Sequence, residues 1–345
     1  MNFSEAIDTF LRRKSRDLAI TKGVASPRTM ETYRYRLEDF ARYILKKTQS
    51  DNVIDKSRED TKLFEQLMST ITFESITEDD IGDYLFECLQ AGISAPTINT
   101  RLYTLRSMWK EISKILKIDN ISKDIPRARY QYRRKSSLTR KHLNELMSHL
   151  NKLKNNNKNA FRNHIFFATI RFYGLRISEA LGLKINSMHL LEDSIKLEIL
   201  GKGNKLRVRT LPLYDLSGNV IQECKEYFED MNTYIKEIRP KYKGCDVDKG
   251  VLFFAQSGNP WNEDSARLSF NNAMKKTNLN MYHYTPHSLR HAFVSHKLAD
   301  GVPLQTVSRL VDHANVSITS TIYAHSEEQD LIDGMTKGIK LEPEN

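Results

Sequence analysis

The chain has 345 residues, of which 39% are apolar and 28% charged, and its net charge is +10. This composition is typical of a soluble globular protein with room for two domains, and it excludes an intrinsically disordered chain. No apolar run approaches the roughly 20 residues of a membrane span, and the acidic N-terminus lacks a signal-peptide core. The few, scattered cysteines Cys88, Cys224 and Cys245 indicate reduced cytosolic thiols, so we expect a cytoplasmic protein without a disulfide framework or a zinc site.

Helical periodicity dominates the first 120 residues. We expect a helix over residues 3–18 and further helices that begin after Ser26, Thr77 and Ser94, each a residue type favoured at the N-cap. Together they predict a bundle of about four or five helices, whose apolar stripes specify a fold and no activity. We expect its outer faces to be basic through Arg34, Arg36, Arg101 and Arg106.

The positive charge is concentrated in the second part of the chain. Basic and acidic residues balance over residues 1–125, so residues 126–345 carry the whole excess. Pro126 interrupts the helical pattern, and we expect a first domain over 1–125, a basic linker over 126–137 and a second domain over 138–345. The linker contains Arg127, Arg129, Arg133, Arg134 and Lys135. Such a run suits a solvated linker or a nuclear-localisation-like patch as well as a strap across a phosphate backbone, and the segment alone does not decide.

The second domain mixes helices with one hairpin. An apolar helix over residues 161–173 ends at Gly174, a residue suited to a left-handed C-cap. Apolar residues alternate over 195–199 and again over 206–210, which predicts two antiparallel strands with Lys202 in the turn between them. We therefore expect a mostly α protein, with a helical bundle followed by an α+β domain that holds a small antiparallel β-sheet.

The last quarter of the chain holds residues suited to phosphate chemistry. A Thr-Pro pair at 285–286 predicts a helix start, which places His287 and Arg290 three apart on one face. His313 and Tyr323, the last tyrosine of the chain, follow. Arginine offers a fixed positive fork to non-bridging phosphate oxygens, histidine moves protons, and tyrosine can be a covalent nucleophile. These parts suit attack on a phosphodiester.

Two earlier features complete this set of residues. Arg176 and Glu179 lie three apart directly after the helix-ending Gly174, and Lys202 lies in the hairpin turn. Taken alone, the first is an ordinary helical ion pair and the second an exposed loop lysine. His313 alone is more typical of a structural histidine.

Together the motifs are more specific. Gly-Leu-Arg-Ile-Ser-Glu, Gly-Lys-Gly-Asn-Lys, His-Ser-Leu-Arg-His, Asp-His-Ala-Asn and Ile-Tyr-Ala-His occur in this order. In this combination the chain resembles the tyrosine recombinase, or phage integrase, family over nearly its whole length. The resemblance implies a helical core-binding domain, a catalytic domain, and site-specific recombination of double-stranded DNA through a 3′-phosphotyrosyl intermediate.

The resemblance also assigns roles to residues. In the family, two arginines clamp the scissile phosphate, two histidines and a hairpin lysine assist, and a tyrosine attacks. The matching residues are Arg176 and Arg290, His287 and His313, Lys202, and Tyr323. Glu179 resembles the acid that holds the first arginine.

The resemblance further implies the partners and cofactors. We expect a homotetramer on two DNA sites, associated with the nucleoid, with accessory DNA-bending or directionality proteins as further partners. The phosphotyrosyl bond stores the energy of the cut, so we expect no metal and no nucleotide cofactor. The sequence agrees, because it lacks a phosphate-binding Gly-x-x-x-x-Gly-Lys-Ser/Thr loop.

Two departures from the family pattern stand out. The usual Leu-Gly-His is Val311-Asp312-His313 here, and the spacing from His313 to Tyr323 is one residue longer than the commonest one. An extra residue rotates a helical side chain by about 100°. The local backbone must absorb this rotation, and the sequence leaves open whether Tyr323 acts in its own subunit or in a neighbour.

Three alternative functions share parts of this pattern. His287 and His291 are spaced like the ligands of a metal hydrolase, but Ser288 stands where the general base would be needed. A catalytically inactive DNA-binding protein of the same architecture would not need the full set of basic and nucleophilic residues. A type IB topoisomerase shares the chemistry and only relaxes DNA, so an assay of strand exchange between two duplexes separates it from a recombinase.

Overall fold

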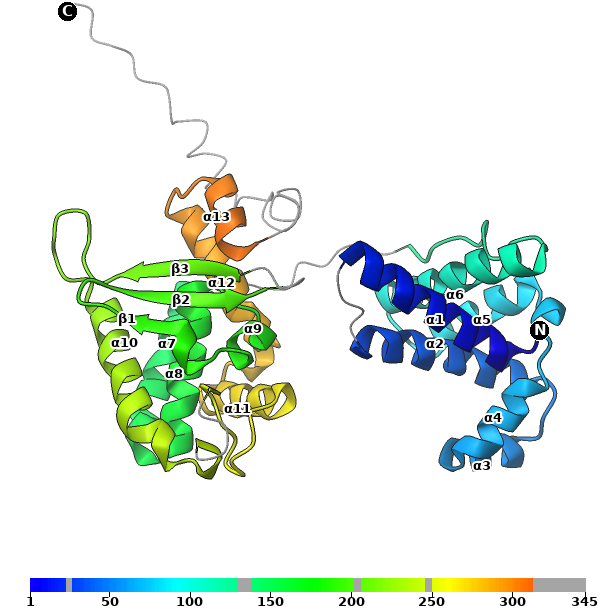
Figure 1. Ribbon diagram of the computed structural model, residues 1–345, viewed down its shortest axis with the longest axis horizontal. Helices are drawn as coiled ribbons and strands as arrows, with labels where there is room; N and C mark the ends of the chain where they lie inside the picture. The colour runs from blue at the N-terminus through cyan, green and yellow to red at the C-terminus, as the bar shows by residue number, and fades with distance from the viewer. Residues whose placement is uncertain (23–26, 130–137, 202–205, 246–249, 313–345) are drawn as a thin grey trace, which may run out of the picture. The chain divides into compact units, whose positions relative to one another are not determined.

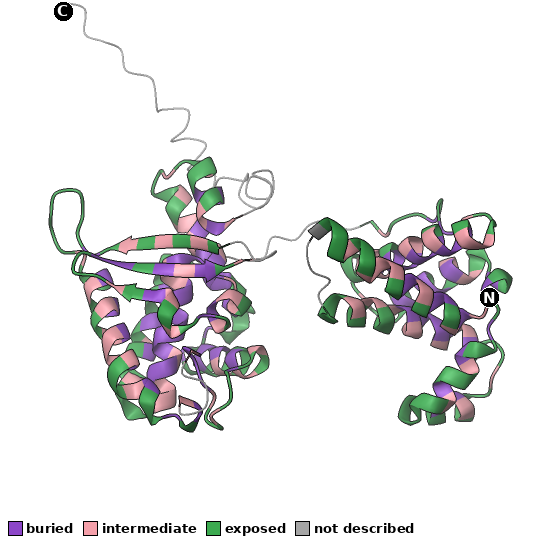
Figure 2. Ribbon diagram, in the orientation of Figure 1, coloured by how far each residue is buried: buried purple, intermediate pink, exposed green. Residues whose placement is uncertain are grey.

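The computed structural model describes residues 1–22, 27–129, 138–201, 206–245 and 250–312 (Figure 1). The chain divides into two compact units, residues 1–133 and 134–345. Each unit has an apolar core of its own (Figure 2). The fold is mostly helical, with one small antiparallel sheet in the second unit.

The described part of the first unit forms six α-helices. They are α1 (Phe3–Lys22), α2 (Pro27–Lys46), α3 (Asp51–Glu59), α4 (Thr61–Ser69), α5 (Glu78–Gln90) and α6 (Ala95–Leu116). The expected number was about four or five, and α3 and α4 are the helices that the sequence did not indicate. They meet at Asp60, which ends α3 and whose carboxylate then accepts the N–H groups of Lys62 and Leu63 to cap α4.

Aromatic side chains hold this helical unit together. Phe73 stacks on Trp109 of α6 with ring centroids 4.7 Å apart, and Phe3 of α1 lies 6.2 Å from each of these two rings. All three side chains are fully buried. Because each large ring removes much apolar surface from water, this cluster fixes the packing of α1 on α6.

The prediction of basic outer faces is wrong for two of the four arginines. Arg101 is 14% exposed and pairs with Asp39 at 2.8 Å. Arg106 donates to the carbonyls of Ser122 and Ile125, which follow α6. Both guanidinium groups therefore stabilise the unit itself, since a fixed fork of donors suits a carboxylate or a set of carbonyls as well as it suits phosphate.

The second unit packs helices against a three-stranded sheet. Its helices are α7 (Arg140–Leu153), α8 (Lys158–Tyr173), α9 (Ile177–Leu181), α10 (Gln222–Thr233), α11 (Glu263–Lys276), α12 (Pro286–Ala299) and α13 (Leu304–Val311). Its strands, in the order β1-β2-β3, are β1 (Met188–Leu190), β2 (Ser194–Leu200) and β3 (Leu206–Pro212), all antiparallel. The central helix α8 is buried along most of its length and packs against α7, α10 and α12. The hairpin of β2 and β3 was predicted, whereas β1 was not.

The two faces of β3 are inverted relative to a simple amphipathic strand. Leu206 and Val208 are 62% and 51% exposed, whereas the side chains of Arg207 and Arg209 are 15% and 19% exposed. Exposed and partly buried residues alternate along β3 (Figure 2). In the register of the hairpin, Arg207 lies opposite the buried Ile199 of β2. The two arginines therefore lie on the inner face, where they meet carboxylates and carbonyls of α9 and α13.

Candidate active site

A tight turn after α8 begins the site. Gly174 ends the helix with φ +63° and donates its N–H to the Ile170 carbonyl at 2.9 Å. A Cβ at this position would lie 2.6 Å from the ring of Phe293 on α12. Glycine is required on both counts, the left-handed backbone and the close ring. The turn leads directly to Arg176, the N-cap residue of α9.

Arg176 and Glu179 form a double contact. The Glu179 carboxylate accepts the backbone N–H of Arg176 at 2.8 Å and its Nη1 at 2.7 Å. The Glu179 side chain is 8% exposed and that of Arg176 is 39% exposed. The carboxylate thus caps α9 and orients a guanidinium group that still faces solvent.

Arg290 of α12 lies next to the same carboxylate, that of Glu179. Its Nη1 donates to the carbonyl of Gly174 at 2.8 Å and lies 3.6 Å from Glu179 Oε2, and its Nη2 donates to the carbonyl of Val311. The side chain is 3% exposed. The structure therefore brings together Arg176 and Arg290, which are far apart in sequence, through one carboxylate.

Two arginines that the sequence reasoning missed complete the cluster. Arg207 donates Nη2 to Glu179 at 3.0 Å and forms an ion pair with Asp312. Arg209 donates to the carbonyls of Arg309 and Leu310 at the end of α13. The available signal was the pair of arginines alternating with apolar residues directly after the hairpin turn.

The electrostatics favour an anion. Burial raises the pKa of Glu179, but hydrogen bonds from the backbone and side chain of Arg176, and then the guanidinium of Arg207, bring it below its ordinary value. Burial lowers the pKa of Arg209, and the nearby charge of Arg207 lowers it further. Among the described residues, four guanidinium groups contact two carboxylates, those of Glu179 and Asp312. The excess positive charge suits a phosphate group.

Two of the three histidines of α12, His287 and His291, lie next to each other. The rings of His287 and His291 are perpendicular with centroids 4.5 Å apart. The hydroxyl of Ser288 accepts the N–H of Thr285 at 3.0 Å, so this serine caps the helix. Within the described ranges no group of three or more His, Cys, Asp or Glu is placed to hold a metal ion.

Several predicted residues lie outside the described part of the chain. They are Lys202, His313 and Tyr323 of the catalytic set and Arg133, Arg134 and Lys135 of the linker. The residues directly before Lys202 and His313 are described, and both adjoin Arg207. A Cβ on Gly201 would overlap the Arg207 guanidinium, and Asp312 is its ion-pair partner.

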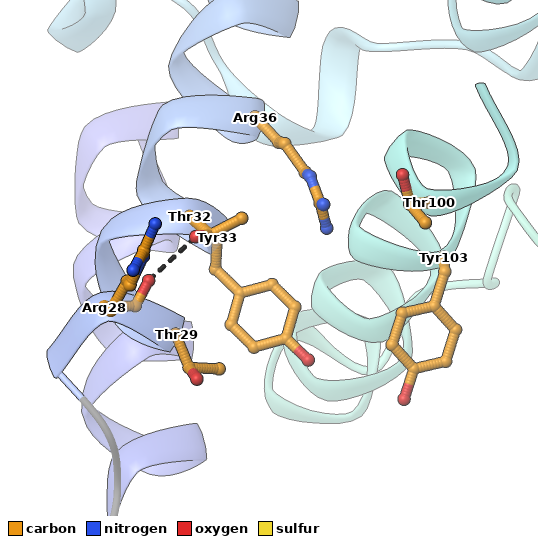
Figure 3. Close-up of a pocket in the computed structure, with 7 residues that line it drawn as sticks. All are labelled: Arg28, Thr29, Thr32, Tyr33, Arg36, Thr100 and Tyr103. Carbon is orange, nitrogen blue, oxygen red and sulfur yellow. Dashed lines mark hydrogen bonds between the residues drawn. The ribbon is translucent and has the colours of Figure 1, made fainter. Parts of the chain in front are cut away.

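The first unit holds a polar hollow of about 350 Å³ between α2 and α6. Figure 3 shows the side chains that line it, Arg28, Thr29, Thr32, Tyr33 and Arg36 from α2 and Thr100 and Tyr103 from α6. Burial raises the pKa of Tyr33, and the neighbouring Tyr103 raises it further. The lining is rich in hydrogen-bond donors.

Comparison with known proteins identifies the family of the chain. The phage integrase family matches residues 136–330, and the phage integrase N-terminal SAM-like domain matches residues 37–114. Tyrosine recombinase XerD of Oceanobacillus iheyensis is 27% identical over 312 residues, covering 87% of this chain and 96% of the relative. Tyrosine recombinase XerC of Bacillus pumilus is 27% identical over 271 residues, covering 75% of this chain and 80% of the relative.

Solved structures agree in fold. XerH site-specific recombinase bound to a palindromic difH substrate, in a post-cleavage complex, superposes with a TM-score of 0.67 at 20% identity, covering 98% of this chain and 96% of that one. The Tn1549 transposon integrase in complex with circular intermediate DNA gives a TM-score of 0.64 at 18% identity, covering 98% of this chain and 100% of that one. The chain belongs to the phage integrase family and is a tyrosine recombinase, an enzyme of site-specific DNA recombination.

The comparisons do not favour the remaining alternatives, an inactive DNA-binding protein or a topoisomerase, because the relatives are named recombinases.

Over the described residues, every helix is too short or too polar to span a lipid bilayer.

Proposed function

We propose that the chain cuts and rejoins DNA through Tyr323. The tyrosine oxygen forms a bond to the scissile phosphorus while the bond from phosphorus to the 5′-oxygen breaks, which leaves a 3′-phosphotyrosyl linkage. Rejoining reverses these two changes with the 5′-hydroxyl of another strand. The observation that carries the proposal is the Glu179 carboxylate, which lies within 3.6 Å of both Arg176 and Arg290.

The two arginines have different accessibility. Arg176 is 39% exposed, so its guanidinium group can meet a non-bridging phosphate oxygen directly. Arg290 is 3% exposed and donates Nη2 to the carbonyl of Val311. We expect Arg290 to exchange this carbonyl for a phosphate oxygen when DNA binds. Because arginine keeps its charge at any working pH, both groups can neutralise the transition state.

Proton transfer needs the remaining members of the set. A free tyrosine has a pKa of about 10, so Tyr323 needs a base such as His287 or cationic neighbours to lose its proton. Lys202 would deliver a proton to the leaving 5′-oxygen. His313 would hydrogen-bond the phosphate. These roles rest on the matching of residues to the family pattern.

We expect both domains to contact the DNA. We assign residues 1–125 to core binding, 126–137 to the linker and 138–345 to catalysis. Arg127 and Arg129 are exposed, and between them Ala128 exchanges two 2.9 Å hydrogen bonds with Asn99 of α6. This contact fixes the start of the linker on α6, the helix that also lines the polar hollow. The linker and the hollow can therefore follow one phosphate backbone.

Assembly and location follow from the same proposal. Recombination joins strands of two duplexes, which suits a homotetramer on two DNA sites, assisted by DNA-bending or directionality proteins. Such a protein would work in the cytoplasm on the nucleoid.

The test is a strand-exchange assay on a site found by sequencing the DNA that the protein cleaves. Two labelled duplexes that carry this site should yield recombinant products in the absence of divalent metal and ATP. Relaxation of supercoiled DNA without any exchange between duplexes would refute the recombinase assignment in favour of a topoisomerase.

A further inference from the structure

Arg207 lies between two carboxylates. Its Nη2 donates to Glu179 Oε1 at 3.0 Å, and its Nη1 forms an ion pair with Asp312. The side chain is 15% exposed. A guanidinium group that is largely removed from water needs such partners, and two carboxylates on different elements fix its position.

Asp312 forms this ion pair from an unfavourable backbone conformation. It ends α13 at φ 46° and ψ 56°, in the left-handed region. Glycine adopts this region freely, whereas a side chain crowds the following carbonyl. The residue that the family usually has at the matching position is glycine. An aspartate here gains the contact with Arg207 and a second one with Arg209 at 3.5 Å.

Arg207 also lies against Gly201, which directly follows β2. The backbone of Gly201 packs so close to the guanidinium that a Cβ there would overlap it. Gly201 directly precedes Lys202, and Asp312 directly precedes His313. One side chain therefore contacts the residues immediately before two of the proposed catalytic groups.

We propose that Arg207 is a positioning residue, and that its ion pair with Asp312 fixes the end of α13 against Glu179. The segment that begins at His313 would then start from a defined point beside the arginine cluster. Arg207 acts through its neighbours and does not touch the DNA in this proposal. The inference rests on the proposed catalytic roles and depends on a carboxylate that the family pattern lacks.

The test compares variants of the full chain on a duplex nicked beside the cleavage site, which traps the covalent protein–DNA adduct. Asp312→Gly relaxes the backbone and removes the carboxylate. We expect it to slow adduct formation at saturating DNA by about 10-fold to 100-fold, the effect of a misplaced catalytic group. The Kd for DNA and the urea midpoint should stay at the parent values, or the midpoint should rise. Asp312→Glu, which keeps a carboxylate, should recover part of the rate.

A double variant distinguishes positioning from a general structural effect. Arg207→Gln should slow adduct formation as Asp312→Gly does, and the combined variant should be no slower than the slower single variant, because both remove the same contact. Arg267→Gln, which removes an ion pair with Glu263 on α11, is the matched control and should keep the parent rate. If Arg207→Gln does not fold, the variants Asp312→Gly and Asp312→Glu alone test the inference.

Two results would overturn the inference. One is an Asp312→Gly variant that forms the adduct as fast as the parent, and the other is a double variant whose losses multiply. Failure of the proposed function is separate, because it would show as an adduct that maps to a residue other than Tyr323 in the parent protein.

Discussion

Replacement of Glu179 by glutamine tests whether one buried carboxylate organises the arginine cluster. The carboxylate is 8% exposed, accepts from Arg176 and Arg207, and lies 3.6 Å from Arg290. Glutamine keeps one acceptor oxygen but no charge, and its amide N–H₂ group faces a guanidinium. Removing one partner of a buried ion pair costs about 3–5 kcal/mol. Because Arg176 is partly in water, we expect the lower end, a fall of about 3 kcal/mol in the free energy of unfolding.

Urea denaturation of the parent and the variant measures this change. Glu263→Gln is the control, because its ion pair with Arg267 is on the surface of α11 and should contribute less than about 1 kcal/mol. The dependence on pH gives a second check. The pKa of Glu179 lies below its ordinary value of 4.5 in the folded protein. Its stabilising effect is therefore present in full above pH 4.5 and is lost as the pH falls through the folded pKa.

The difference between parent and Gln variant should thus be constant near neutral pH and shrink in acid. A loss no larger than that of the Glu263→Gln control would refute the argument that Glu179 organises the cluster. So would a difference that does not change between neutral and acidic pH.

Three further predictions concern the turn, the linker and the C-terminus. Gly174→Ala should lower the free energy of unfolding by about 2–4 kcal/mol in urea denaturation, because it adds both left-handed strain and a clash with an α12 ring. Gly92→Ala, where nothing lies within 4 Å, should show the strain alone, and equal losses would contradict the clash. Replacing Arg127 and Arg129 by glutamine should weaken binding to all DNA sequences alike and reduce the salt slope by about one unit per lost phosphate contact; an unchanged slope would reduce the segment to a bare linker. Deleting residues 327–345 should spare DNA binding but reduce assembly of the two-duplex complex in gel-shift assays, because we expect the apolar stripe Leu331, Ile332, Met335 and Ile339 to insert into a neighbouring subunit. Normal recombination by the truncated protein would refute this role.

Local rules predicted several helix ends, whereas α1 continues to Lys22 instead of residue 18 and α8 begins at Lys158 instead of residue 161. Thr77 is the expected N-cap of α5 and forms a capping box with Asp80, Gly174 ends α8 in the left-handed region, and Pro286 begins α12. Each depends on contacts within a few residues, which a sequence displays directly. The prediction that placed Arg176 and Glu179 together succeeded for the same reason.

Contacts across the chain were not predictable in this way. The alternation in β3 located the strand, but its arginines face inward because Glu179 and Asp312, far away in sequence, lie there. Arg101 was expected on an outer face, yet it binds Asp39. In these cases a distant carboxylate decides which face of an element is buried, and a single sequence gives no sign of that partner.

The central claim is that Tyr323 is the nucleophile, and its replacement by phenylalanine tests this most directly. The change removes one oxygen and keeps the ring, so folding and the Kd for DNA should be unchanged. On a duplex nicked beside the cleavage site, the parent should form a covalent adduct on a denaturing gel and Tyr323→Phe should form none. Arg176→Ala should also form little, since loss of one donor to the developing charge costs on the order of 3–4 kcal/mol. An adduct formed by Tyr323→Phe would contradict the account and place the nucleophile elsewhere in the chain.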